Sequence, residues 1–248
     1  MKRVIHQARF LSLVVCCAVC IVGGSASLAA VDHAPFDVIL RDVVQDERVD
    51  YAKVKANHTE ALGQYLDALA AVDATALSRE EQLAYYINLY NATMMKAVVE
   101  RGGPAFKPPE GDFAVFKDKL VRTREGTFSL NELENDIIRK RFDDARIHAA
   151  LNCAAVSCPP ILPRAYLAAD LNATLDENVR RWLNDPNRNV IDRTARKLRL
   201  SKIFDWYAPD FGGKENAAAW VAEKLGDPAL AAYAVEYLEY DWTLNARR

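Results

Sequence analysis

The stretch around which the rest of this sequence is organised runs Arg146-Ile-His-Ala-Ala-Leu-Asn-Cys-Ala-Ala-Val-Ser-Cys-Pro-Pro-Ile161. It contains the only histidine of the C-terminal half, His148, together with Asn152, Cys153 and Cys158 in an otherwise apolar run. Imidazole, amide and thiol groups close together are the usual material of catalytic and ligand-binding sites. The stretch is therefore the candidate functional site.

Three interpretations of the cysteine pair stay open. In an oxidising compartment, a disulfide between Cys153 and Cys158 closes a short loop, and the two prolines that follow stiffen its exit. A free, nucleophilic Cys153 is the second interpretation; a direct pair with His148 needs a bend, because residues five apart lie on opposite faces of a regular strand. Metal ligation is the third, but three ligands fall short of a structural zinc site. We expect no metal and no cofactor.

His148 lies among apolar residues, where a histidine is either a satisfied core residue or a general base. An imidazole acts as a base near neutral pH when a carboxylate or an amide orients it. The candidate catalytic residues are accordingly His148, Cys153, Asn91, Asn152 and Glu134. The candidate substrate-binding residues are Asn88, Tyr90 and Arg146, although Arg146 could equally pair with Asp143 or Asp144.

The first 29 residues have the pattern of an export signal. Basic residues precede an apolar run over 10–23, and Ser27-Leu-Ala29 provides a small-residue cleavage site before Ala30. The run is shorter than the roughly 20 apolar residues of a spanning helix. We therefore expect a periplasmic or secreted protein without stable membrane insertion, in which Cys153 and Cys158 are the only remaining cysteines.

Composition and apolar periodicity indicate the fold class. The chain has 32 basic and 34 acidic residues, and no stretch is basic enough to propose a nucleic-acid partner. Residues 30–248 are long enough for one sizeable core and contain no repeat or convincing linker, so they are predicted to form a single domain. We expect a helix-rich α+β domain with a small antiparallel sheet.

Local signals place the expected elements. The predicted helices are 59–69, one from the capping box of Ser78 and Glu81 to Gly102, one from the box of Ser129 and Glu132 to about 141, then 166–183 and 217–225. The predicted strands are 116–122 with 126–130, 189–192 with 197–201, and 235–242.

Two amides lie on or near the apolar stripe of the second helix. Asn91 is about 40° from Ile87 around the helix axis, and Asn88 lies at the edge of the stripe. A buried amide without partners costs about 1–3 kcal/mol. Asn91, and with it Asn88, is thus expected to hydrogen-bond to another segment, either as a structural clamp or to orient a catalytic group.

Several blocks follow one another in an order typical of a known family: Tyr86-Ile-Asn-Leu-Tyr-Asn91, Ser129-Leu130 with Leu133-Glu134, Arg146-Ile-His148, Asn152-Cys153 with Ser157-Cys-Pro-Pro160, Leu198-Arg-Leu-Ser201 ahead of Trp206-Tyr207, and Tyr240-Asp-Trp-Thr-Leu-Asn245. Through these blocks, residues 49–245 resemble the family called domain of unknown function 547. In that family a histidine often follows the glutamate of the second block, and here that position is Asn135. The family's name leaves its activity open. The resemblance points to the site residues Asn88, Asn91, Glu134, Arg146, His148, Asn152, Cys153 and Cys158.

A fainter similarity is to the papain and transglutaminase architecture, in which a core helix packs on antiparallel strands and a histidine lies on one strand. Those enzymes carry their cysteine at the start of the core helix, and the helix that begins after Ser78 has none there. If the architecture is shared, the nucleophile has moved to Cys153 or has been lost.

Two functions are compatible with these residues. The first is an exported envelope domain that binds a small-molecule or peptide ligand, or a partner, through a cleft around His148 and Cys153. The alternative is a thiol- or histidine-dependent hydrolase or acyl-transfer enzyme acting on peptide or envelope substrates, with His148 as base, Cys153 as nucleophile and Asn91 or Asn152 as orienter or oxyanion donor. The redox state of the cysteines separates the two, since a disulfide removes the thiol mechanism.

Overall fold

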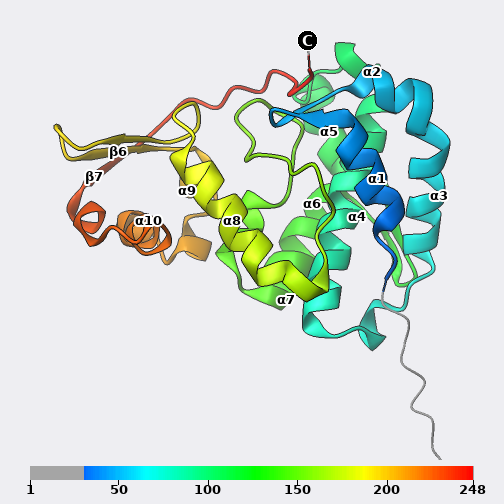
Figure 1. Ribbon diagram of the computed structural model, residues 1–248, viewed down its shortest axis with the longest axis horizontal. Helices are drawn as coiled ribbons and strands as arrows, with labels where there is room; N and C mark the ends of the chain where they lie inside the picture. The colour runs from blue at the N-terminus through cyan, green and yellow to red at the C-terminus, as the bar shows by residue number, and fades with distance from the viewer. Residues whose placement is uncertain (1–30, 248) are drawn as a thin grey trace, which may run out of the picture.

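The computed structural model describes residues 31–247, so the expected export signal lies outside the described residues. The described chain is a helix-rich α+β structure, as predicted (Figure 1). Its helices are α1 (Ala34–Val43), α2 (Tyr51–Lys53), α3 (Thr59–Ala70), α4 (Arg79–Glu100), α5 (Glu110–Lys117), α6 (Leu130–Glu132), α7 (Arg139–Phe142), α8 (Leu171–Asn184), α9 (Ile203–Trp206) and α10 (Ala217–Leu225). Its strands are β1 (Val44–Gln45), β2 (Arg48–Val49), β3 (Val121–Thr123), β4 (Gly126–Phe128), β5 (Val190–Asp192), β6 (Lys197–Leu200) and β7 (Ala234–Tyr237).

The strands form three small sheets. The pairs β1–β2, β3–β4 and β5–β6 are antiparallel, which confirms the two predicted hairpins. β7 joins β6 in parallel, with Leu198 opposite Val235. The strand predicted over 116–122 is shorter than expected, because Phe113 and Phe116 lie one helical turn apart on α5 and both contact Trp242.

α4 is the central helix of the larger core. It starts at the predicted capping box, in which Ser78 and Glu81 each accept a hydrogen bond from the other's backbone N–H. Nearly every residue from Leu83 to Val99 is buried, so the helix is surrounded by protein rather than lying on a surface. In Figure 1, α3 lies beside α4 on the side away from α8.

The buried side chains divide into two hydrophobic clusters, and the central stretch lies where they meet. The larger cluster contains Ile147 and the first half of α8, and the smaller cluster contains Ala149 and Trp182 from the second half of α8. His148 lies between Ile147 and Ala149 in the chain, and so between the two clusters. Side chains from both clusters can therefore reach the same site.

The chain beyond β7 returns across the molecule as an extended segment, 238–247, drawn in red in Figure 1. It pairs with the central stretch through Asn245 N–H to the Ala154 carbonyl (2.8 Å) and Val156 N–H to the Thr243 carbonyl (2.7 Å). It ends against β2, where Val49 and Ala246 form a parallel bridge. The predicted strand 235–242 is thus a strand to Tyr237 and irregular afterwards.

A membrane-spanning helix was not expected after the leader. Within residues 31–247, the helices are too short or too polar to cross a bilayer.

Candidate functional site

The central stretch begins as a 3₁₀ turn, Ala145–Ala149, and continues as an irregular loop. The Asp144 side chain caps the turn by accepting a hydrogen bond from Arg146 N–H (3.0 Å). Ala154 adopts a positive φ of 64°, which turns the loop back on itself. His148 therefore lies on a turn and not on a strand, so this residue does not carry the similarity to the papain architecture.

Buried amides hold the loop in place. The Asn91 side chain donates to the Ala150 carbonyl (2.9 Å) and accepts from Asn152 N–H (2.8 Å), which confirms the expected hydrogen bonds across the core. Asn88 makes the same two-way contact with the backbone of Tyr166 (2.7 and 3.0 Å). Asn178 on α8 donates to the carbonyls of the loop as well. Because these amides engage backbone groups, their role is to position the loop.

The side chains of two other candidates bond to groups other than the cysteines and His148. The Asn152 side chain accepts from Ala154 N–H (3.0 Å) and donates to the Pro159 carbonyl (3.1 Å). The guanidinium of Arg146 is held by Asp144 and Asp176, at 2.7 and 2.9 Å, and lines a different cavity. The structure does not place Arg146 with the other site residues.

The remaining candidates line one cavity of about 380 Å³. The structure brings together Tyr90, Glu134, His148, Cys153 and Cys158 there. Most of the other lining side chains are aromatic or aliphatic. Cavities of this size, with apolar walls and a few convergent polar groups, are typical of small-molecule sites.

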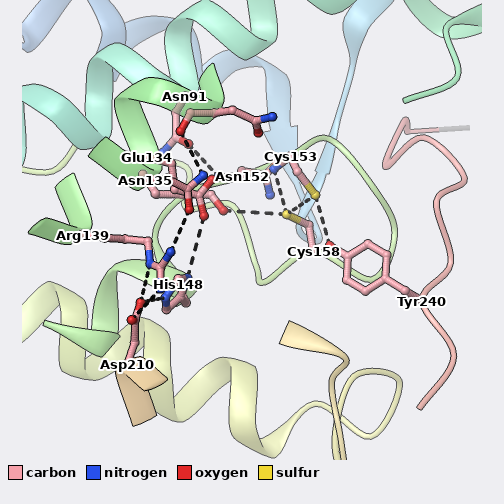
Figure 2. A network of polar contacts seen from close by, with 12 residues as sticks. Asn91, Glu134, Asn135, Arg139, His148, Asn152, Cys153, Cys158, Asp210 and Tyr240 are labelled. Carbon is pink, nitrogen blue, oxygen red and sulfur yellow. Dashed lines mark hydrogen bonds and ion pairs between the residues drawn. The ribbon is translucent and has the colours of Figure 1, made fainter. Parts of the chain in front are cut away.

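His148 is oriented by a carboxylate from a distant part of the chain. Its Nε2 lies 2.7 Å from Asp210, whose carboxylate also accepts two hydrogen bonds from Arg139, at 2.6 and 2.7 Å (Figure 2). Burial raises the pKa of Asp210, but the bonds from His148 and Arg139 outweigh it and hold the pKa well below its usual range. An ionised carboxylate can only accept, so Nε2 carries the proton and Nδ1 is the nitrogen left for chemistry.

Nδ1 of His148 faces a second carboxylate. It lies 3.9 Å from Oε1 of Glu134, which is beyond hydrogen-bond range. Tyr207 packs against the imidazole, with ring centroids 4.2 Å apart and the rings tilted by 33°, and is hydrogen-bonded to Glu134. Burial and this carboxylate raise the pKa of Tyr207, so its hydroxyl stays protonated and donates to Glu134.

The helix that carries Glu134 is widened at that point. A π-helical segment, Leu133–Ile138, lies between α6 and α7, and such segments are frequent at functional sites. Asn135, the residue that follows Glu134, accepts a hydrogen bond from Arg139 (2.8 Å). Asn135 therefore belongs to the same network, because Arg139 connects it to Asp210 (Figure 2).

The expected disulfide is not formed. Cys153 and Cys158 are both free, with their sulfur atoms 2.8 Å apart. A disulfide requires about 2.05 Å. The loop does turn back as the disulfide interpretation required, but it brings two thiols into contact.

Cys153 is the more acidic thiol of the pair. Burial raises its pKa, but hydrogen bonds from Cys158, from the Tyr240 hydroxyl (3.1 Å) and from Ala155 N–H outweigh burial and lower the pKa. Burial and the neighbouring Cys153 sulfur raise the pKa of Cys158 well above its usual value. Burial, with the nearby sulfurs, also raises the pKa of Tyr240, so both neighbours remain protonated donors. The arrangement favours a thiolate on Cys153.

The lowered pKa of Cys153 does not depend on the imidazole. Among the contacts of the described residues, none joins Cys153 to His148, although both line the cavity. Figure 2 shows them in separate groups, with Asp210 and Arg139 behind His148, and Tyr240 beside Cys153. The direct dyad considered from the sequence is not formed.

Sequence reasoning missed Asp210, Arg139 and Tyr207. Asp210 lies 62 residues from His148, and nothing in the local pattern of either residue indicates the other. The signal that could have found it is an acidic residue inside an aromatic segment, Trp206-Tyr-Ala-Pro-Asp-Phe211, where burial demands a partner.

Across residues 31–247, no group of three or more His, Cys, Asp or Glu side chains is placed to hold a metal ion.

The family resemblance is supported by a direct comparison. Residues 74–183 match the family model described as "Protein of unknown function, DUF547". This segment is DUF547-like. It contains α4, the π-helical segment and the central stretch with both cysteines, whereas Asp210, Tyr240 and Trp242 lie beyond it. No curated protein and no solved structure gives a significant match to the chain.

Proposed function

We propose that the cavity is the active site of a thiol-dependent acyl-transfer enzyme or hydrolase, with Cys153 as the nucleophile. The observation that carries the proposal is the hydrogen-bonding environment of Cys153: three donors favour its thiolate inside the cavity that also contains the Asp210-oriented His148. An activated nucleophile and a separately oriented base in one apolar cavity are the parts that acyl transfer requires.

The proposed reaction has two steps. In the first step the Cys153 thiolate, whose proton has passed to Nδ1 of His148, attacks the carbonyl carbon of a peptide, amide or ester. The bond to the leaving group breaks as that group takes the proton from Nδ1. In the second step, Nδ1 accepts a proton from water, or from another nucleophile that receives the acyl group. That nucleophile attacks the thioester and releases Cys153 as a thiolate. Glu134 lies on the Nδ1 side and stabilises the imidazolium from which the first step starts and which the second step restores.

The test is acylation of the protein by p-nitrophenyl acetate, followed by intact-mass and peptide mass spectrometry. We expect one acetyl group on Cys153, no acylation in Cys153→Ala, and slower but detectable acylation in Cys158→Ala. His148→Ala should accumulate the acyl-enzyme, because the second step lacks its base. Alkylation of the purified protein without reductant is done first: a closed disulfide, or acylation that persists in Cys153→Ala, would contradict the proposal.

A non-catalytic ligand-binding domain is the second candidate. The aromatic lining of the cavity and the missing Cys153–His148 hydrogen bond favour it. In that case the wild type and Cys153→Ala bind the same ligands with the same affinity, and neither is acylated.

We also propose that the protein is exported. The proposal rests on the basic start, the short apolar run and the small residues before Ala30. N-terminal sequencing of the protein recovered from its native host is expected to begin at or near Ala30. An intact N-terminus at Met1 would argue against export.

A further inference from the structure

One wall of the cavity is built from aromatic rings that come from three separate segments. α5 supplies Phe113, α9 ends in Trp206, and the C-terminal segment supplies Tyr240 and Trp242. Trp242 lies at the centre: its ring centroid is 4.9 Å from Phe113, 4.6 Å from Tyr240 and 5.8 Å from Trp206. Segments so far apart in sequence converge here on one continuous surface.

The wall is open on its cavity side. Trp206 is 45% exposed, although it stacks on Trp242 and makes a tilted contact with Tyr240, and all three rings line the cavity. A tryptophan left this accessible keeps a large apolar surface in water, which a ligand can cover. The ring faces and edges that the cavity exposes are therefore available for stacking.

The wall stands directly beside the proposed nucleophile. The Tyr240 hydroxyl lies 3.1 Å from the Cys153 sulfur, whereas Glu134 and His148 lie on the opposite side of the cysteine pair in Figure 2. The cavity thus has an aromatic end and a carboxylate–imidazole end, with the sulfur between them. When Cys153 attacks a carbonyl carbon, the acyl substituent of that carbon would lie against the rings, and the leaving group would lie towards Nδ1 of His148.

We propose that the aromatic wall selects acyl donors that carry a planar aromatic group next to the scissile carbonyl, with Trp206, Tyr240 and Trp242 as the specificity-determining residues. This inference rests on the proposed acyl transfer at Cys153. Aromatic pairs in offset or edge-to-face contact add to simple area burial, and two such contacts are together worth about tenfold in affinity.

A sugar ring fits this end of the cavity poorly. Sugar hydroxyls need hydrogen-bond partners when they leave water. The Tyr240 hydroxyl is already engaged by Cys153, the faces of the aromatic rings carry no hydrogen-bonding group, and the indole N–H groups of Trp206 and Trp242 are too few to satisfy a ring of hydroxyls. An apolar, flat group gains contact without that cost.

Binding can be measured without catalysis in the Cys153→Ala protein, by calorimetry with phenylacetamide, hexanamide and N-acetylglucosamine as probes. We expect phenylacetamide to bind about tenfold more tightly than hexanamide, and the sugar to bind least. Adding Trp206→Ala should remove about tenfold of the phenylacetamide affinity, and Trp206→Phe should restore most of it. Trp220→Phe is the matched control, because Trp220 packs on Phe204 and Phe211 away from the cavity.

The kinetic counterpart compares p-nitrophenyl phenylacetate with p-nitrophenyl hexanoate in the protein with Cys153 intact. The ratio of their kcat/KM values is expected to favour phenylacetate and to fall towards one in Trp206→Ala. Equal affinities for phenylacetamide and hexanamide, or tighter binding of the sugar, would overturn the inference even if acetyl transfer to Cys153 is observed. Selective phenylacetamide binding without acylation would instead refute the proposed function and leave the aromatic site standing.

Discussion

At the scale of single residues, the acidity of Cys153 depends on two neighbours that contribute no charge. Cys158 and Tyr240 are both kept protonated by burial and by the sulfur between them, so each remains a donor to a Cys153 thiolate. Neutral donors here take the place of the nearby cation that lowers the pKa of many reactive cysteines. The Cys153 thiolate is stabilised by hydrogen bonding, so removing a donor should raise the pKa of Cys153, which can be measured.

Tyr240→Phe should raise the pKa of Cys153, since it removes one of the donors to the thiolate and keeps the ring. A hydrogen bond to a charged group is worth about 1.5–3 kcal/mol, so the inflection in the rate of Cys153 alkylation should move up by about one pH unit or more. The measurement is iodoacetamide labelling against pH, with Cys153 followed by peptide mass spectrometry. Tyr233→Phe, outside the cavity, is the control and should leave the pH dependence of Cys153 alkylation unchanged. If Tyr240→Phe also leaves it unchanged, the Tyr240 hydroxyl does not lower the pKa of Cys153.

Asp210→Asn tests the support of His148 through the pH dependence of stability. The folded-state pKa of Asp210 lies below the unfolded value near 3.8, so its stabilisation is present at neutral pH and is lost as the pH falls through and below that value. We expect Asp210→Asn to cost about 2 kcal/mol at pH 7, because Arg139 and His148 lose a partly buried partner. Urea unfolding at several pH values should show the gap to the wild type narrowing as the pH falls below 4. Asp136→Asn, which breaks an exposed pair with Lys140, should cost under about 0.5 kcal/mol throughout.

At the scale of elements, α4 fixes the position of the central stretch. Asn88 and Asn91 lie almost one helical turn apart and hydrogen-bond to two different segments. Asn88 binds the backbone of Tyr166, and Asn91 binds the backbone of Ala150 and Asn152. Between these segments the chain carries Cys153 and Cys158, and His148 lies just before the first of them, so the loop is fixed at intervals although it has little regular structure of its own. A loop held in this way can keep a thiol in a defined place.

Asn91→Ala should therefore loosen the loop as well as destabilise the fold. It leaves a buried carbonyl and a buried N–H without partners, at about 1–3 kcal/mol each, so we expect the free energy of unfolding to fall by about 3 kcal/mol. Chemical denaturation gives that value, and hydrogen exchange at Asn152 N–H should speed up in the same variant. Asn184→Ala, which loses only an exposed hydrogen bond, serves as the control; equal effects in the two variants would contradict the clamp.

Elements with local signals could be predicted from the sequence, and contacts between distant elements could not. The capping boxes at Ser78 and Ser129 located two helix starts, and apolar periodicity predicted that Asn91 is buried. The bidentate contact of Arg139 with Asp210 and the position of Tyr240 over Cys153 depend on how segments tens of residues apart pack. For the same reason the sequence indicated the loop, but not that the Asn152 side chain hydrogen-bonds to the backbone of that loop or that Arg146 lines a different cavity.

At the scale of the whole molecule, the site depends on both hydrophobic clusters. Glu134 and Cys153 belong to elements packed in the larger cluster, while Tyr207 packs against the smaller one and Asp210 lies in the turn that follows. The segment 238–247 crosses from one cluster to the other and carries Tyr240 and Trp242 into the cavity on the way (Figure 1). The cavity is complete only while this segment is docked.

The docking point of the segment is Asn245. Its buried side chain accepts from the Tyr51 hydroxyl (2.8 Å) and donates to Asn152 (3.2 Å), and its backbone pairs with Val49 and Ala154. Asn245→Ala leaves Tyr51 and Asn152 without these partners, so we expect a loss of about 2 kcal/mol in stability. Since the same segment carries Tyr240, the alkylation pKa of Cys153 should rise in Asn245→Ala even though this residue does not touch the sulfur.

Thermal unfolding and the alkylation profile, measured on the same samples, separate the two effects. Glu239→Ala is the matched control, because Glu239 is an exposed residue of the same segment. If Asn245→Ala lowers stability but leaves the Cys153 profile unchanged, then Tyr240 stays in place through its own contacts with Trp206 and Trp242. If both change together, the last residues of the chain control the reactivity of a thiol some 90 positions earlier, and the two clusters act as one unit at the site.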